Sequence, residues 1–115
     1  MALRLGLVVF LVLALASCAQ AGVPTSQPDI AGTITHTATG SILVEERPSG
    51  TAGSAKASIR VTTATAFWRA VSVSAQPATA AELREAQHVM AWFDGPAAMS
   101  YPLQATAKAI LILER

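Results

Sequence analysis

The sequence predicts a small, mainly β domain of five short strands and one short helix, preceded by a signal peptide and a tether. Apolar and β-branched residues alternate with polar ones over several short segments, as is typical of half-buried strands. Clusters of Gly, Pro and Ser separate these segments and indicate turns and loops. A capping-box pattern, Thr79 followed by Glu82, marks the place where we expect the helix to begin.

The composition is that of one folded domain with few groups suited to catalysis. The chain has 115 residues, of which 52% are hydrophobic and 13% charged, and its formal net charge is +1. The high apolar content argues against a disordered chain, and the small net charge gives no basic field for nucleic acid. A single cysteine excludes a disulfide framework.

Residues 1–17 are interpreted as a lipoprotein signal peptide. Arg4 supplies a positive charge, and residues 5–16 contain no polar side chain. This run is too short for a membrane-spanning helix, which needs about 20 apolar residues. It ends in Leu-Ala-Ser followed by Cys18 and resembles a bacterial lipobox, in which the cysteine is diacylglycerylated and becomes the N-terminus. We therefore expect Cys18 to be lipidated and to anchor the protein to the lipid bilayer.

Residues 18–29 are expected to form this lipidated N-terminus and a flexible tether, because Pro, Gly and small polar residues interrupt any apolar period. The predicted location is the bacterial cell envelope, with the domain held at the outer face of the membrane. Ala19, rather than an Asp, follows Cys18. In a cell with two membranes this favours the outer membrane.

Residues 30–115 form the predicted folded domain, which begins with a hairpin. Strands are expected over residues 30–38 and 42–47, with a turn between them, and 48–54 has the composition of an exposed loop. One face of the first strand is expected to contain Ile30, Gly32, Ile34 and His36.

A third strand is expected over residues 57–65, with Ile59, Val61 and Thr63 on one face. Residues 66–75 also alternate, and are expected to continue this strand past a bend or bulge.

A helix of about two turns is expected over residues 79–87, with Leu83 as its buried residue.

The fourth strand is expected over residues 88–95, with Val89, Ala91 and Phe93 on one face. The fifth is expected over residues 104–113. Its inward face is predicted to contain Ala105, Ala107, Ala109, Leu111 and Leu113. Because Ile110 and Ile112 are apolar on its other face, both faces of the end of this strand should be covered.

The element order of three strands, a helix and two strands is that of the OB-fold, a five-stranded, partly open barrel. A flat sheet with one helix on its face is the alternative.

The chain also resembles a family of small bacterial lipoproteins, the YobA-like proteins, whose domain has no established function. The resemblance covers about residues 30–113 and is most specific from Gly95-Pro96 to Ala107, where a Ser-Tyr-Pro-x-Gln-Ala run precedes the last strand. It implies an OB-like barrel on a lipid anchor. The family usually has Gly where this chain has Ala86. If that residue is left-handed, alanine there costs about 1 kcal/mol.

The candidate catalytic groups are few, and we expect no enzyme, no cofactor and no metal site. His36 and His88 lie in no recognisable nucleophile motif, and two histidines with scattered carboxylates make a poor ligand set. The pairs Glu45-Glu46 and Glu82-Glu85 are best explained as solvated side chains.

We therefore expect a non-catalytic binding or interaction module of the cell envelope, whose partner is an envelope protein. The alternative is a module that binds glycan or another small ligand on an aromatic barrel face. Trp92, Tyr101, Arg60 and Trp68 are the candidate binding residues. For Trp92 the competing interpretation is a packed side chain under the helix or a loop. For Tyr101 it is a structural role, in which the ring is buried and the hydroxyl bonds to a backbone carbonyl. Nucleic acid is not an expected partner, because binding it requires a basic groove beside the aromatic residues.

Overall fold

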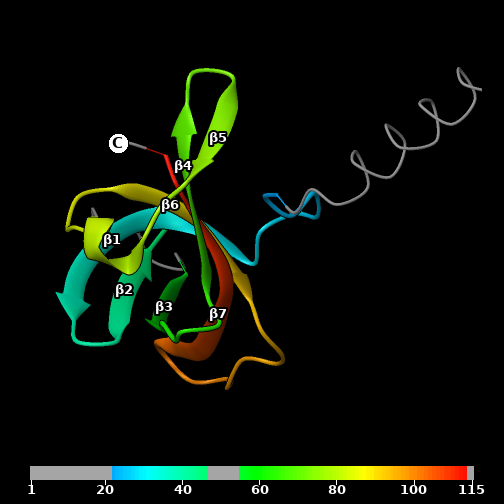
Figure 1. Cartoon of the computed structure of the whole chain (residues 1–115). Helices are drawn as coiled ribbons and strands as arrows, with labels where there is room; N and C mark the ends of the chain where they lie inside the picture. Colours follow the sequence, from blue (N-terminus) through cyan, green and yellow to red (C-terminus); the bar gives the residue numbers. More distant parts are fainter. Residues whose placement is uncertain (1–21, 47–54, 114–115) are drawn as a thin grey trace, which may run out of the picture.

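A computed structural model describes residues 22–46 and 55–113 (Figure 1). The predicted signal peptide, Cys18 and the loop predicted over 48–54 lie outside the described residues. The elements are β1 (Ile30–Ala38), β2 (Ser41–Glu45), β3 (Lys56–Arg60), β4 (Ala66–Val71), β5 (Ser74–Pro77), the 3-10 turn η1 (Ala80–Glu82), β6 (His88–Phe93) and β7 (Leu103–Ile112). No helix in the described part of the chain is long and apolar enough to cross a membrane.

Five of the strands close into a barrel in the order β1-β2-β3-β7-β6. Neighbouring strands are antiparallel except β3 and β7, whose parallel pairing closes the barrel. The predicted OB-like barrel is therefore confirmed, and it is closed rather than partly open. Closure excludes the flat sheet that the element order also allowed.

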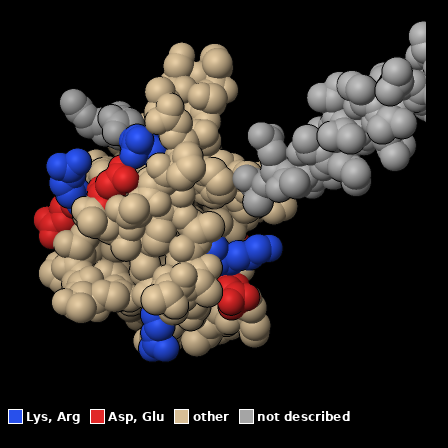
Figure 2. Space-filling view, in the orientation of Figure 1, with Lys and Arg blue, Asp and Glu red and all other residues tan. Residues whose placement is uncertain are grey.

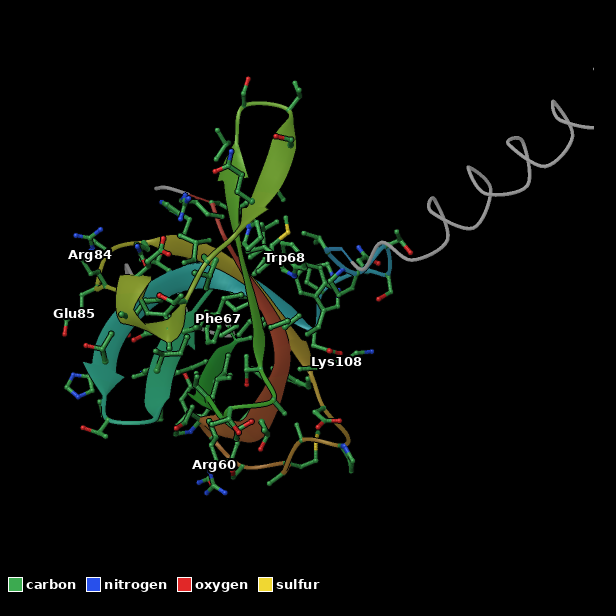
Figure 3. All side chains as sticks on the ribbon, viewed as in Figure 1. Arg60, Phe67, Trp68, Arg84, Glu85 and Lys108 are labelled. Carbon is green, nitrogen blue, oxygen red and sulfur yellow. The ribbon has the colours of Figure 1, made fainter. Side chains whose placement is uncertain are left out.

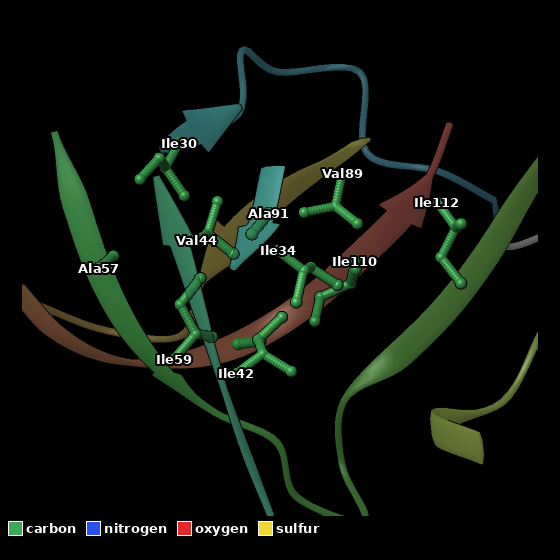
Figure 4. Close-up of a cluster of buried hydrophobic side chains, with 11 residues drawn as sticks. Ile30, Ile34, Ile42, Val44, Ala57, Ile59, Val89, Ala91, Ile110 and Ile112 are labelled. Carbon is green, nitrogen blue, oxygen red and sulfur yellow. The ribbon is translucent and has the colours of Figure 1, made fainter. Parts of the chain in front are cut away.

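The core of the barrel is built mainly from isoleucine and valine (Figure 4). Each barrel strand contributes at least one side chain to it, and Ile34, Ile59 and Ile110 are fully buried. β-branched side chains pack well on a pleated surface, and each buried one contributes about 1.5–3 kcal/mol. The alternation of apolar and polar residues that predicted the strands therefore also identifies the core residues.

β1 bends so that it can pair with β2 along one edge and β6 along the other. A Cβ added at Gly32 would lie 2.3 Å from the carbonyl oxygen of Glu45, so this close approach requires glycine. The register with β2 shifts between Ile34 and His36. The prediction that His36 shares the face of Ile34 is therefore wrong, and its side chain is exposed.

The predicted third strand is divided into three shorter strands. β3 ends at Arg60, and a turn follows in which Thr65 Oγ1 accepts a hydrogen bond from the Thr62 N–H and donates one to Ala107 O (3.0 and 2.7 Å). The chain then forms the β4–β5 hairpin, and β4 pairs in parallel with the end of β7. This hairpin projects from the barrel (Figure 1).

The predicted two-turn helix is a single 3-10 turn, η1. The capping interaction is present, because the Thr79 N–H donates to Glu82 Oε2 at 3.2 Å. The sequence offers this segment only Leu83 as an apolar anchor, and short helices are unstable without a packed face. Leu83 is half-buried and already extended, and Ala86 has a left-handed φ of 77°.

β7 turns different side chains inward from those predicted. Ala107 is in the core, but beyond it Ile110 and Ile112 point inward, while Ala109 and Leu111 lie on the outer face. The cause is a bulge, because Trp92 pairs with Ala109 but Phe93 with Ala107. The prediction that both faces are covered here is confirmed, since Ala109 is only 3% exposed.

Candidate binding face

The outward side chains of β2, β3 and the start of β7 form a continuous surface, which we call the polar face. Strand register arranges them in rows across the three strands. The rows are Ser41, Arg60 and Thr106; Leu43, Ser58 and Gln104; and Glu45 with Lys56. Only Leu43 lacks a polar side chain, so this surface is suited to hydrogen bonding with a ligand.

A groove of about 570 Å³ lies at the Arg60 end of the polar face. Its walls are the β1–β2 turn and the loop over residues 94–98, which is fixed to β7 by hydrogen bonds from Asp94 N–H to Thr106 O (2.7 Å) and from Ala98 N–H to Gln104 O (2.8 Å). Arg60 is exposed and has no ion-pair partner among the described residues. Its guanidinium donors are therefore available to a ligand.

Tyr101 lies at the other end of the polar face, with 72% of its surface exposed. Lys56 Nζ is 5.6 Å from the centre of the Tyr101 ring and 3.8 Å from Glu45 Oε2. Glu45 also accepts a hydrogen bond from Thr35 Oγ1 at 2.8 Å. The lysine is thus held between a carboxylate and an aromatic ring, an arrangement that favours one position of the ring.

Of the four candidate binding residues, Arg60 and Tyr101 lie on the polar face, one at each end. Along β3, Lys56 and Arg60 are four residues apart, a separation of about 13 Å at the usual rise per residue. An exposed aromatic ring and an exposed cation therefore mark the two ends of one hydroxyl- and amide-rich surface.

The two tryptophans lie on a different surface, the outer side of β4, β6 and β7. Trp92 is only 5% exposed, and its Nε1 donates to Ser26 O at 3.0 Å. Residues 22–29, which we call the strap, pack there, and Asp29 Oδ2 accepts a hydrogen bond from the Phe93 N–H at 2.8 Å. Trp92 is therefore packed beneath part of the predicted tether, and its ring is not available for stacking on a ligand.

Trp68 lies in the same outer row as Leu111 and Met90. It is half-buried, and its Nε1 is the buried side-chain polar atom without a hydrogen-bond partner among the described residues. Figure 3 shows it away from Arg60, on the side of the barrel where the strap lies. It does not join Arg60 in one site.

Among the residues that the structure describes, the other ionisable groups form no cluster larger than an ion pair. His36 Nδ1 is 3.8 Å from Glu85 Oε2 on the exposed surface, and Glu82 pairs with Arg69. Within residues 22–46 and 55–113, no group of three His, Cys, Asp or Glu could hold a metal ion. Charged side chains are scattered over the face in Figure 2, and the outer end of the projecting hairpin carries none there. Arg69, the charged residue of β4, pairs with Glu82.

Sequence reasoning did not place Ser58, Gln104 and Asp94 together in one binding site. The signal for Ser58 was present, since it alternates with the core residues Ala57 and Ile59 and so must point outward. The other two become neighbours of Arg60 only through the parallel β3–β7 pairing, which no local pattern specifies.

Comparison with known proteins gives no match: no family model fits the chain, and neither a curated protein nor a solved structure matches it.

Proposed function

We propose that this protein is a lipid-anchored, non-catalytic binding module of the bacterial cell envelope. The observation that carries the proposal is the polar face, with Arg60 and Tyr101 exposed at its two ends. OB-fold proteins commonly bind ligands across the second and third strands, between the loop after the first strand and the loop before the last. The polar face occupies the equivalent position.

The anchor in this proposal is Cys18. Two or three acyl chains, at about 0.8 kcal/mol per buried CH₂, would hold the domain durably on the membrane. The test is metabolic labelling with an alkyne fatty acid, followed by membrane fractionation. We expect the label in the membrane fraction, and we expect Cys18→Ala to lose both label and membrane association. Label that persists in Cys18→Ala would contradict the anchor.

The partner in this proposal is an envelope protein. A glycan is the second candidate, and the exposed Tyr101 ring beside the hydroxyls and amides of the polar face supports it. A sugar ring can lie against an aromatic face while its hydroxyls bond to Ser58, Gln104 and Arg60. A protein partner would place its own polar groups there instead.

Site-specific crosslinking in the producing cell tests the proposal and separates the two candidates. A photoreactive amino acid replaces Gln104 in the intact lipoprotein, and captured species are identified by mass spectrometry. Lys108 is the control position, because it is exposed on the same strand but does not line the groove. We expect one envelope protein, or one glycan mass, captured at position 104 and absent at 108.

Capture that is equal at both positions, or unchanged in Arg60→Ala, would contradict a binding role for the polar face.

A further inference from the structure

A second cavity opens at one end of the barrel, and its lining is less polar than the groove of the polar face. It has a volume of about 650 Å³, within the range usual for small-molecule sites. Four segments surround it: the β1–β2 turn, residues 61–65, the start of β4 and residues 78–83. We call this cavity the end pocket.

The end pocket exists because little covers this end of the barrel. The connection from β5 to β6 supplies only the single turn η1, none of whose residues is buried. Phe67 and Leu83 pack partly against the barrel core and partly line the pocket. Figure 3 shows Phe67 on β4, facing the side of the barrel that η1 approaches.

The lining combines apolar side chains with hydroxyls and contains no charged residue. The apolar part includes Ile42, Val61, Phe67 and Leu83. The hydroxyl part includes Thr37, Ser41, Thr62, Thr63, Thr65 and Thr79. An ion entering such a site would lose its hydration without gaining a countercharge, so the site selects against charged ligands.

Five of the six hydroxyls of the end pocket divide into two groups, and the sixth, that of Thr79, belongs to the capping box of η1. Those of Thr62 and Thr65 are used within the wall: Thr62 Oγ1 accepts from the Ala64 N–H at 3.1 Å, and Thr65 bonds to β7. The side chains of Thr37, Ser41 and Thr63 have no hydrogen-bond partner among the described residues. The wall is therefore fixed, while these hydroxyls can bond to a ligand.

We propose that the end pocket binds an uncharged small molecule that has an apolar ring or short chain and one or two hydrogen-bonding groups. Phe67, Leu83 and Val61 contact its apolar body, and the hydroxyls of Thr37, Ser41 and Thr63 contact its polar groups. The end pocket and the groove of the polar face share the β1–β2 turn, because Gly40 and Ser41 line both, but their other residues differ. The groove contains the charged residues Arg60 and Asp94, whereas the end pocket contains none.

Two fluorescent probes that share a ring system test the proposal. N-phenyl-1-naphthylamine is uncharged, and 1-anilinonaphthalene-8-sulfonate adds a sulfonate. The protein is the chain from residue 18 with Cys18→Ser, which retains every described residue and the whole closed barrel. We expect a saturable fluorescence increase with the uncharged probe, and binding of the sulfonated probe at least tenfold weaker.

The pocket is then blocked by Ala80→Trp, whose side chain enters the pocket from η1. The matched control is Ala75→Trp, an exposed residue of β5 outside the pocket. We expect Ala80→Trp to abolish saturable binding of the uncharged probe, while Ala75→Trp and Arg60→Ala bind normally. Circular dichroism confirms that each variant is folded.

Non-saturable fluorescence, equal binding of the two probes, or the same loss in Ala75→Trp would overturn the proposal. None of these results bears on the polar face, whose test is the crosslinking at position 104.

Discussion

The barrel has two outer surfaces that each carry an aromatic residue, but the two rings differ in how much of their surface is exposed. On the polar face, Tyr101 is 72% exposed and rests beside Lys56. On the surface that the strap covers, Trp92 is 5% exposed and bonds to Ser26. Both aromatic residues occupy positions where strand alternation or a loop turns the side chain away from the core.

The comparison shows that a side chain that points away from the core is not necessarily accessible to a ligand. Alternation along a strand assigns a side chain to the inner or outer face. It does not say whether another segment covers the outer face. Here a proline-containing segment with no apolar period covers Trp92 through backbone and side-chain hydrogen bonds.

The largest expected effect comes from truncating the two aromatic residues in parallel. Trp92→Ala should lower the free energy of unfolding by about 3–5 kcal/mol, because it leaves a cavity beneath the strap. Tyr101→Ala should change it by less than about 0.5 kcal/mol, because the ring is exposed. Urea unfolding of the chain from residue 18 with Cys18→Ser measures both. Equal losses of stability in the two variants would show that Trp92 is not more tightly packed than Tyr101.

The next effect concerns how the strap is held. Asp29→Ala removes the acceptor of the Phe93 N–H and should cost about 1 kcal/mol, since the contact is solvent-exposed. It should also red-shift the tryptophan emission, because Trp92 gains solvent as the strap loosens. Asp94→Ala, on an exposed loop residue whose side chain makes no hydrogen bond in the described part, is the control. A variant Asp29→Ala whose stability and emission match the control would show that the strap does not depend on this contact.

An effect of similar size distinguishes the two tryptophans on the outer side of β4, β6 and β7. Trp92→Phe keeps most of the ring but removes the donor to Ser26 O, and should cost about 1 kcal/mol. Trp68→Phe removes a buried donor that has no partner among the described residues. It should therefore be neutral or slightly stabilising. The measurement is again urea unfolding, and a larger loss for Trp68→Phe would reverse the assignment.

The parts of the fold that follow from short-range patterns could be predicted. The β1–β2 hairpin, the core positions Ile34, Ile59 and Val89, and the OB-like order of elements all depend on alternation and turn residues. The predictions were wrong where a β-bulge inserts one extra residue, because the bulge reverses which side chains of the strand point inward. The bulge opposite Trp92 moved Ile110 and Ile112 inward, and the one after Ile34 turned His36 outward.

The candidate site was predicted only in part, for a similar reason. Tyr101 and Arg60 could be named as candidates from their residue types, but the sequence equally allowed a buried Tyr101 ring. Their places on one face depend on the parallel pairing of β3 with β7. The burial of Trp92 depends on the path of the strap. Both are contacts between segments far apart in sequence, and local patterns contain no information about them.

The smallest expected effect comes from Ala86, which lies on neither surface and so gives a reference for both. Its φ of 77° is held by hydrogen bonds to β1, from Ala86 N–H to Ile34 O and from Ile34 N–H to Gln87 O, each 2.8 Å. A left-handed alanine costs about 1–2 kcal/mol, and part of this is offset by the greater chain entropy of glycine. Ala86→Gly should therefore raise the free energy of unfolding by about 0.5–1 kcal/mol. Ala81→Gly, in η1, should lower it. If both changes destabilise the protein alike, the left-handed conformation at Ala86 is not strained.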